Sequence, residues 1–197
     1  MTAAILAGGR ATRMGGAEKA FLVVDGEAIL DRQVRVLQPR FGEIVVAVAP
    51  GADTMKYSSR GLSVVIDQYQ GSGPMAGLHA ALEACKTEWL FAVAGDMPFL
   101  EGSIIDRIAG LAVGAHDADA LVPLPNGRPE PLHAFYRAGI KAAAARSIES
   151  GRLAMTDLFD AIRTRYLDDR DVPGLSSSRS FSNLNTPEDL AGAAGRS

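Results

Sequence analysis

The stretch from Leu6 to Lys19 constrains this chain more than any other part of it. It follows directly on the apolar run Thr2–Leu6, which predicts a buried β-strand. It then becomes glycine-rich and basic at once, with the sequence LAGGRATRMGGAEK. Glycines let a backbone approach a ligand closely and present several N–H groups to one anion. A strand that leads into such a loop indicates an α/β nucleotide site, and a solvated surface loop is the alternative.

The charges of this loop favour phosphate as the ligand. Arg10, Arg13 and Lys19 can bracket phosphate oxygens, and only Glu18 opposes them. The loop is not a Walker P-loop, because no Gly-Lys pair follows its glycines.

Composition limits the remaining classes. The 197 residues are 47% hydrophobic and 22% charged, which predicts a single domain over residues 1–197. A net charge of −3 argues against nucleic acid as a partner. The single cysteine, Cys85, excludes a disulfide framework and a cysteine metal cluster. Since we find neither a signal region nor a long apolar run, we expect a cytoplasmic protein that does not contact a membrane.

Apolar runs alternate with helical patterns along the chain. After Thr2–Leu6, the predicted strands are Glu43–Val48, Leu62–Ile66, Trp89–Ala94 and Ala118–Val122. Helices are predicted around Leu30–Leu37, from Met75 onward, over Ser103–Leu111 and over Ala138–Ile148. This order predicts an α/β fold with a mostly parallel sheet that is covered on both faces.

Turn signals add detail to this fold. Asp25-Gly26 predicts a tight turn, and Asn126-Gly127 predicts a hairpin that returns through Pro131–Tyr136 as an antiparallel addition to the sheet. Pro173–Ser180, with one glycine and several serines, is the stretch that we expect to be flexible. Thr186 and Pro187 predict the start of a last helix.

Two predicted strands run into aspartates, Asp67 and Asp96. Ligands of open parallel sheets bind outside the carboxyl ends of the strands, so both carboxylates are candidates for the site. Mg²⁺ binds one or two carboxylates together with substrate phosphates. The alternatives are local: Asp96 could cap the segment after Pro98, and Asp67 could open an Asx turn.

The stretch Gly71–Gly77 joins a strand to a helix through Gly73 and Pro74. A proline at the start of a helix, after glycines, leaves backbone N–H groups free for an anion. The alternatives are a plain strand-to-helix turn and a variant of the dinucleotide fingerprint, which would indicate a dehydrogenase.

Near the end of the chain, Asn183 and Asn185 alternate with apolar residues. Both amides could contact a substrate or tie the last helix to the sheet. His133 lies alone in an apolar run, so a buried structural role is favoured over catalysis. The histidines have no metal-ligand spacing, which argues against a zinc site.

Taken together, five blocks of the chain resemble the molybdenum cofactor guanylyltransferase (MobA) family and extend over nearly its whole length. They are Leu6–Lys19 with its L-A-G-G, R-M-G and E-K parts, Gly73–Gly77, Gly95–Phe99, Arg128–Tyr136 and Phe181–Leu190. The resemblance implies a Rossmann-like three-layer α/β/α nucleotidyltransferase fold. It also implies transfer of GMP from GTP to the terminal phosphate of molybdopterin or the molybdenum cofactor, with Mg²⁺ as cofactor and pyrophosphate as the second product. Molybdoenzyme apoproteins or their chaperones are then possible partners.

The resemblance also implies residue roles. Asp96 would bind Mg²⁺, while Arg13 and Lys19 would act in catalysis on the triphosphate and the leaving pyrophosphate. The nucleotide would be bound by Leu6, Ala7, Gly8, Gly9, Lys19, Asp67 and Asp96. The acceptor would be bound by Gly73, Pro74, Gly77, Asn183 and Asn185.

Three positions bear on the choice of base. Gly9 favours guanine, because relatives that use GTP tend to have L-A-G-G where this chain has Leu6–Gly9, whereas the cytidylyltransferase relatives tend to have L-A-A-G. Ala47 stands where some guanylyltransferases have an asparagine that contacts the nucleotide, and Glu18 replaces an aspartate. A transferase that uses CTP or another phosphorylated acceptor, and a GTP- or pterin-binding protein without transfer activity, are therefore the alternative functions.

Overall fold

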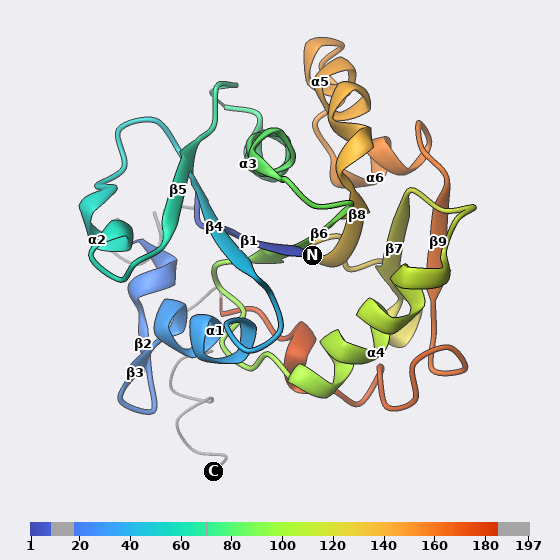
Figure 1. The fold of residues 1–197 in the computed structure, drawn as a ribbon, viewed down its shortest axis with the longest axis horizontal. Coiled ribbons are helices and arrows are strands. Elements are labelled where there is room, and N and C mark those ends of the chain that lie inside the picture. The colour runs from blue at the N-terminus through green and yellow to red at the C-terminus, as the bar shows by residue number, and fades with distance from the viewer. Residues whose placement is uncertain (9–17, 70, 185–197) are drawn as a thin grey trace.

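The computed structural model describes residues 1–8, 18–69 and 71–184 of the chain. Seven strands form one sheet in the order β5-β4-β1-β6-β8-β7-β9, with β2 and β3 as a separate small hairpin (Figure 1). The strands of the sheet are β1 (Thr2–Leu6), β4 (Glu43–Val48), β5 (Ser63–Ile66), β6 (Trp89–Ala94), β7 (Ala120–Pro123), β8 (His133–Arg137) and β9 (Thr164–Leu167). Only β8 is antiparallel to its neighbours β6 and β7, so the sheet is mostly parallel as predicted.

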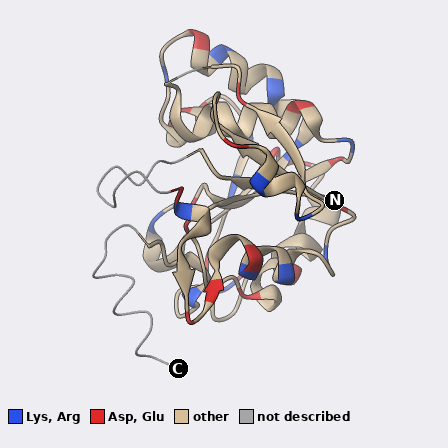
Figure 2. Ribbon diagram, turned by 90° about the vertical axis from the view of Figure 1, so that its left-hand side faces the viewer, with Lys and Arg blue, Asp and Glu red and all other residues tan. Residues whose placement is uncertain are grey.

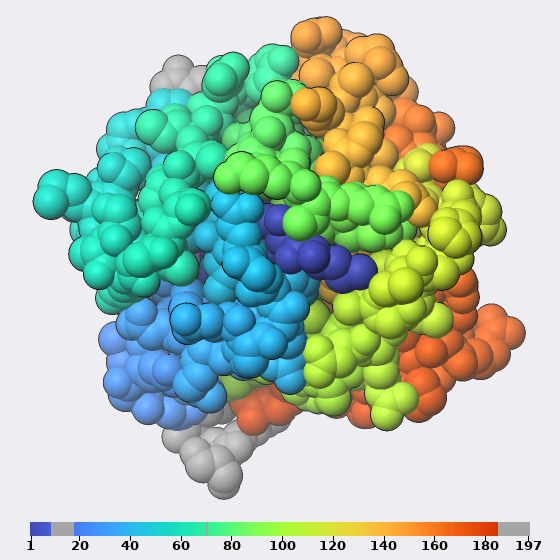
Figure 3. Space-filling view, viewed as in Figure 1, coloured from blue at the N-terminus to red at the C-terminus, as the bar shows by residue number. Residues whose placement is uncertain are grey.

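Strand β1 occupies the middle of this sheet. All of its residues are buried, and it pairs in parallel with β4 on one side and β6 on the other. In the space-filling view the amino-terminal residues, in dark blue, lie between the blue and green surfaces of the flanking segments (Figure 3). The register places Leu6 beside both Ala47 and Ala94, so these three strands end at the same edge.

Helices cover both faces of the sheet. They are α1 (Ile29–Leu37), α2 (Met55–Ser58), α3 (Gly73–Ala84), α4 (Gly102–Gly114), α5 (Lys141–Glu149) and α6 (Met155–Phe159). On one face α1 and α4 share an apolar cluster with Ala3 and Ile5, and on the other α3, α5 and α6 share a second cluster with Ala4 and Leu6 (Figure 1). Alternate residues of a strand point to opposite faces, so β1 contributes to two cores. The predicted three-layer α/β/α architecture is confirmed.

Both predicted tight turns are present. Asp25 and Gly26 have φ angles of 49° and 80° between β2 (Val23–Val24) and β3 (Glu27–Ala28), as a two-residue hairpin of this kind requires. Asn126 and Gly127 also have positive φ angles and begin the return to β8. Strand β8 then pairs with both β6 and β7, which confirms the antiparallel addition.

Other predictions needed correction. Pro173–Ser180, expected to be flexible, is packed: Leu175 and Ser180 are buried, and Asp169 accepts hydrogen bonds from the backbone and side chain of Ser176. The sequence does not predict strand β9 or the short helices α2 and α6. The helix expected to start near Met75 begins at Gly73, and the last helix predicted from Thr186 lies outside the described residues.

Basic and acidic residues are interspersed along the described helices and loops (Figure 2). Among the described residues, ion pairs at the surface include Arg35 with Glu27 and Arg60 with Asp31. Within the described ranges, no helix combines the length and the apolar character needed to cross a bilayer.

His133 at the start of β8 is a buried junction between this strand and the carboxyl-terminal part of the chain. Its Nε2 lies 2.7 Å from the Ser180 Oγ, and its ring contacts those of Phe91 and Phe181. The Ser180 Oγ also accepts a hydrogen bond from the Glu101 N–H. Burial lowers the pKa of His133 from 6.5 to about 4, because the charged imidazolium would lose its hydration there. The structural role favoured for this histidine fits these contacts.

This pKa shift predicts a pH dependence of stability. The unfolded chain takes up a proton at His133 as pH falls below 6.5, whereas the folded chain resists protonation down to about 4. The contribution of His133 is therefore fully present above pH 6.5 and is lost between pH 6.5 and 4, by at most about 3 kcal/mol. Urea unfolding at pH 7.5 and at pH 4.5 tests this. The free energy of unfolding should decrease less between the two pH values in His133→Gln than in the wild type. The exposed His116, changed to Gln, is the control and should keep the wild-type difference. Equal pH dependence in all three proteins would contradict the prediction.

Candidate active site

A pocket of about 390 Å³ opens at the edge where β1, β4, β5 and β6 end. This is the edge at which open α/β sheets bind their ligands. Nine residues of the predicted site line it together: Leu6, Ala7, Gly8, Lys19, Asp67, Gly73, Pro74, Gly77 and Asp96. Its other lining residues are Ala20, Ala47, Ala49, Gly71, Ala94, Gly95 and Leu132.

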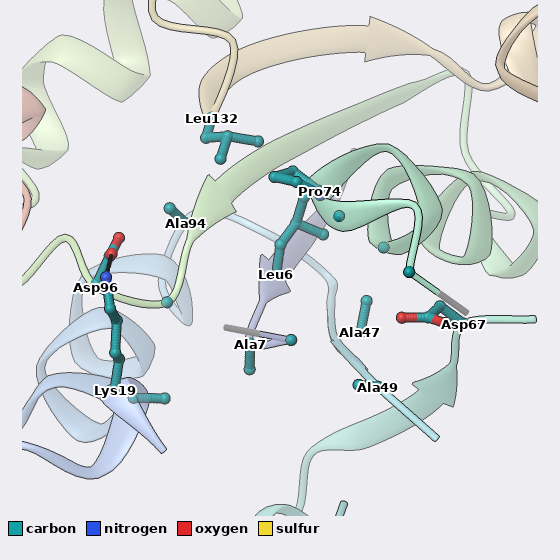
Figure 4. A pocket seen from close by; sticks show the side chains of 16 residues that line it. Leu6, Ala7, Lys19, Ala47, Ala49, Asp67, Pro74, Ala94, Asp96 and Leu132 are labelled. Carbon is teal, nitrogen blue, oxygen red and sulfur yellow. Dashed lines mark hydrogen bonds and ion pairs between the residues drawn. The ribbon is translucent and has the colours of Figure 1, made fainter. Parts of the chain in front are cut away.

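Lys19 and Asp96 form a charged pair at one end of the pocket (Figure 4). The Lys19 Nζ donates to the Asp96 Oδ2 at 2.7 Å, and only 20% and 16% of the two side chains are exposed. The carboxylate thus binds an ammonium group and does not cap the segment after Pro98. Two residues 77 positions apart are brought together, so Lys19, the last cation of the predicted phosphate-binding stretch, meets the predicted metal ligand.

Asp67 lies at the opposite end of the pocket, with Leu6 and Ala47 between it and the charged pair (Figure 4). Its exposed fraction is 9%, and its Oδ1 has no hydrogen-bond partner among the described residues. Burial raises the pKa of the Asp67 carboxyl above its usual value. A buried acceptor without a donor is costly, so this carboxylate is suited to receive N–H groups from a ligand. An Asx turn would require the Asp67 carboxylate to accept a hydrogen bond from a backbone N–H just after it in the chain. The buried Oδ1 accepts none from the described residues.

The floor between these two ends is built from small apolar residues. A Cβ atom on Gly77 would lie 3.6 Å from the Leu6 Cδ2 and 3.8 Å from the Ala47 Cβ, which are ordinary van der Waals distances. Packing of α3 on β1 and β4 therefore does not by itself require glycine here, and the predicted role of Gly77 in acceptor binding stays a prediction. Ala47 and Ala49 add methyl groups and no amide, so this floor offers an apolar face to a flat ring.

The amino-terminus of α3 forms a third wall. Gly73 starts the helix with a φ of +58°, Pro74 follows, and the side chain of the N-cap residue Ser72 does not cap it. The first N–H groups of a helix carry a partial positive charge and bind anions when no side chain satisfies them. This wall can therefore contact a phosphate group in the pocket.

Gly95 sets the distance between the Asp96 turn and β1. Its N–H donates to the Leu6 carbonyl at 3.0 Å. A Cβ atom at this position would lie 3.2 Å from the Leu6 oxygen and 3.3 Å from the Ala7 Cα, closer than backbone atoms tolerate without moving. Only glycine lets Asp96 approach the end of β1 this closely.

Glu18 anchors the end of the glycine-rich loop. Its carboxylate accepts a hydrogen bond from the Tyr57 hydroxyl at 2.9 Å and lies 3.5 Å from the Lys56 Nζ. Burial, and then the hydrogen bond to Glu18, raise the pKa of Tyr57. The acidic residue before Lys19 thus ties this part of the chain to α2.

Leu132 enters the pocket from the connection before β8. Its carbonyl accepts from the Ala94 N–H at 3.0 Å, and its own N–H donates to the Glu130 Oε1 at 3.2 Å. Burial raises the pKa of Glu130, and the negative charge of Asp96 adds to the rise. Both residues belong to the block Arg128–Tyr136, but neither was predicted as a site residue.

The structure does not test all of the predicted site residues. Gly9, Arg13 and Asn185 lie outside the described residues. Asn183 is exposed and does not line the pocket, but the N–H of its neighbour Leu184 donates to the Asp96 carbonyl at 2.9 Å. This contact supports the alternative in which the segment has a structural role, and acceptor binding by Asn183 stays a prediction.

The donor set at Asp96 can be compared with the needs of a metal ion. No group of three or more His, Cys, Asp or Glu residues that could hold a metal occurs in the parts of the chain that the structure describes. A closed protein cage is therefore not formed there. Mg²⁺ commonly binds through one or two carboxylates plus phosphates and water, which a single Asp96 beside a triphosphate would provide.

A comparison with models of protein families shows to which family the chain belongs. A model described as the MobA-like NTP transferase domain matches residues 3–167, from β1 to the end of β9. The chain belongs to the MobA-like NTP transferase family. The family resemblance inferred from the five sequence blocks is thereby confirmed.

Individual members of the MobA-like family are similar over nearly the whole chain. A probable molybdenum cofactor guanylyltransferase of Pelotomaculum thermopropionicum is 33% identical, covering 98% of this chain and 91% of the relative. A molybdenum cofactor guanylyltransferase of Vibrio parahaemolyticus is 30% identical, covering 95% and 91%.

Solved structures agree with the MobA-like fold. Molybdopterin-guanine dinucleotide biosynthesis protein A from Archaeoglobus fulgidus superposes with a TM-score of 0.85 at 28% identity, covering 98% of this chain and 97% of that one. The 2-C-methyl-D-erythritol 4-phosphate cytidylyltransferase from Thermus thermophilus has a TM-score of 0.70 at 22% identity, covering 98% and 96%. The second likeness shows the fold alone.

Proposed function

We propose that this chain transfers GMP from GTP to the terminal phosphate of molybdopterin or the molybdenum cofactor. The products are the guanine dinucleotide cofactor and pyrophosphate. The names of the relatives and the resemblance of the five blocks support this assignment. The observation that carries it is one pocket with the Lys19–Asp96 pair at one end and the buried Asp67 at the other.

The Asp67 end supports guanine as the base. Guanine carries an N1–H and an N2–H₂ side by side, and an ionised carboxylate can accept both. Cytosine has only its N4–H₂ donor, flanked by an acceptor that a carboxylate repels. Asp67 can in this way replace the amide that is missing at Ala47. The apolar floor at Ala47 and Ala49 would lie against the face of the ring.

The Lys19 end supports phosphoryl chemistry. The terminal phosphate of the pterin forms a bond to the α-phosphorus of GTP while the bond between the α- and β-phosphates breaks and pyrophosphate leaves. The nucleophile is already anionic, so a general base is not needed, and the barrier is charge repulsion and alignment. Lys19 would exchange its contact with Asp96 for phosphate oxygens, and the amino-terminus of α3 would hold a second phosphate group.

The cofactor of this proposal is Mg²⁺, held by Asp96. When bound there beside GTP, the ion would neutralise negative charge on the triphosphate. We place the reaction in the cytoplasm, with molybdoenzyme apoproteins or their chaperones as possible recipients of the product.

Release of pyrophosphate in the presence of a molybdopterin acceptor tests this function. With MgCl₂, GTP should give turnover at least about tenfold faster than CTP, ATP or UTP, as one well-formed bidentate base contact allows, and EDTA should stop the reaction. Mass spectrometry of the product should show one added GMP. A preference for CTP would assign the chain to the cytidylyltransferases. Tight GTP binding without pyrophosphate release would assign it to the binding proteins.

A further inference from the structure

The backbone that carries Asp96 is a single β-turn. Strand β6 ends at Ala94, and the Met97 N–H returns to the Ala94 carbonyl at 3.3 Å. Gly95 and Asp96 are the two central residues of this turn. The direction of the Asp96 carboxylate therefore depends on how firmly the two ends of the turn are held.

One side chain holds both ends. Gln33 of α1 is fully buried, and its Nε2 donates to the Ala94 carbonyl at 2.7 Å and to the Met97 carbonyl at 3.0 Å. The two hydrogens of a single amide group thus bridge the first and the last residue of the turn. The contact joins positions more than 60 residues apart in sequence.

The surroundings of Gln33 indicate that its amide group serves to bond the turn and not to fill the core. It lies in the buried stripe of α1, whose other members are Ile29, Leu30 and Leu37. Its Oε1 is buried without a hydrogen-bond partner among the described residues, which is unfavourable. An apolar side chain would fill this position without that cost. Rotating the amide would place its oxygen against two carbonyl oxygens, so the donor orientation is the favourable one.

Other contacts hold the turn at single points. The Gly95 N–H bonds to the Leu6 carbonyl, the Asp96 carbonyl accepts from the Leu184 N–H, and the Arg32 Nε donates to the Pro98 carbonyl at 3.2 Å. These bonds fix the turn to β1, to the carboxyl-terminal segment and to α1. Among the described side chains, Gln33 is the one that closes the turn itself.

We infer that Gln33 is a positioning residue for GMP transfer, which acts by closing the Ala94–Met97 turn and so aiming the Asp96 carboxylate at the Lys19 end of the pocket. The inference rests on the proposed function for the role of Asp96. Gln33 is fully buried and is not among the residues that line the pocket. Its loss should therefore affect the rate of the chemical step more than the binding of GTP.

Gln33→Met tests the inference, because methionine has a similar length and volume but no donor. The kcat should fall by roughly 10- to 100-fold, as expected for a misplaced catalytic group, while the KM for GTP changes less than about threefold. Gln38→Met is the matched control: Gln38 is exposed at the end of the same helix and should leave both constants unchanged. An unchanged kcat in Gln33→Met, or an equal loss in Gln38→Met, would overturn the inference.

Gln33→Glu provides a pH signature and a second variant if Gln33→Met does not fold. A protonated glutamic acid can donate one hydrogen bond to the turn, whereas its carboxylate repels both carbonyls. Burial raises the pKa of a carboxyl group, so we expect the glutamic acid to become protonated between pH 8 and pH 6. The turnover of Gln33→Glu, divided by that of the wild type at the same pH, should therefore rise at least about threefold as pH is lowered from 8 to 6. A ratio that is the same at both pH values would count against closure of the turn by this amide.

Hydrogen exchange separates this inference from the proposed function. The Met97 N–H, bonded to Ala94 inside the turn, should exchange at least about tenfold faster in Gln33→Met than in the wild type and in Gln38→Met, as local opening of a released turn implies. This measurement needs neither nucleotide nor acceptor. A wild-type protein without GMP transfer would refute the proposed function, whereas unchanged exchange at Met97 would refute the closure of the turn by Gln33.

Discussion

Replacing Asp96 with alanine is expected to abolish Mg²⁺-dependent GMP transfer, with a loss of at least about 10³-fold in kcat. Among the described residues, Asp96 is the one carboxylate at the charged end of the pocket, 2.7 Å from the Lys19 Nζ. Without it, that end keeps its cation but loses the oxygen ligand proposed for Mg²⁺. Pyrophosphate release measured over a range of MgCl₂ concentrations gives both the rate and the metal dependence.

The fold should survive this substitution. The side chain of Asp96 is bonded to Lys19, whereas the turn is held through its backbone by Gln33 and Leu184. Urea unfolding of Asp96→Ala should therefore remain a single cooperative transition. Asp106→Ala is a suitable control, because Asp106 is an exposed carboxylate that also pairs with a basic residue, Arg40. Full activity of Asp96→Ala would remove this residue from the metal site.

Replacing Lys19 with alanine is expected to lower kcat by roughly 10²–10³-fold. The ammonium group is mostly buried at the pocket wall, where it is less screened by water than a surface charge. It can therefore stabilise the charge that develops on the leaving pyrophosphate. Initial rates at varied GTP concentration separate this loss in kcat from a change in KM.

Lys56→Ala is the matched control for this prediction. Lys56 is a nearby lysine with a side chain that is 48% exposed, and its partner Glu18 precedes Lys19. Its loss should change turnover by less than about threefold, as for an exposed ion pair. A similarly small change in Lys19→Ala would show that Lys19 does not meet the triphosphate.

The two largest effects should not be additive. Lys19 and Asp96 are in direct contact, and residues in contact change each other's contribution. The double variant should therefore be only slightly less active than Asp96→Ala alone.

The central strands could be predicted at the bounds that the structure has. Thr2–Leu6, Glu43–Val48 and Trp89–Ala94 are apolar runs because parallel strands in the middle of a sheet are covered on both faces. Strand β9 has no such run. Its Arg165 and Tyr166 are exposed at the edge of the sheet, so the sequence Thr164–Leu167 carries no clear strand signal.

Site residues could be predicted only where the adjacent sequence has a recognisable pattern. Lys19 follows a glycine-rich loop, and Asp67 and Asp96 follow strands, so local sequence points to each of them. Gln33 does carry a signal, a polar residue in the apolar stripe between Leu30 and Leu37. Its partners are 61 and 64 residues away, however, and only the folded chain reveals them.

Strand β8 runs antiparallel to the other strands, so the residues before it, and not those after it, lie at the pocket. The parallel strands of the pocket contribute residues at or after their carboxyl ends, whereas β8 contributes Leu132, which precedes it. The connection from Leu124 to Leu132 can therefore vary in length or composition and reshape one wall of the pocket, while Asp67 and Asp96 keep their positions on separate strands. In this architecture, the wall formed by Leu132 and the strand ends that precede Asp67 and Asp96 belong to separate pieces of chain, so each can change in sequence independently of the other.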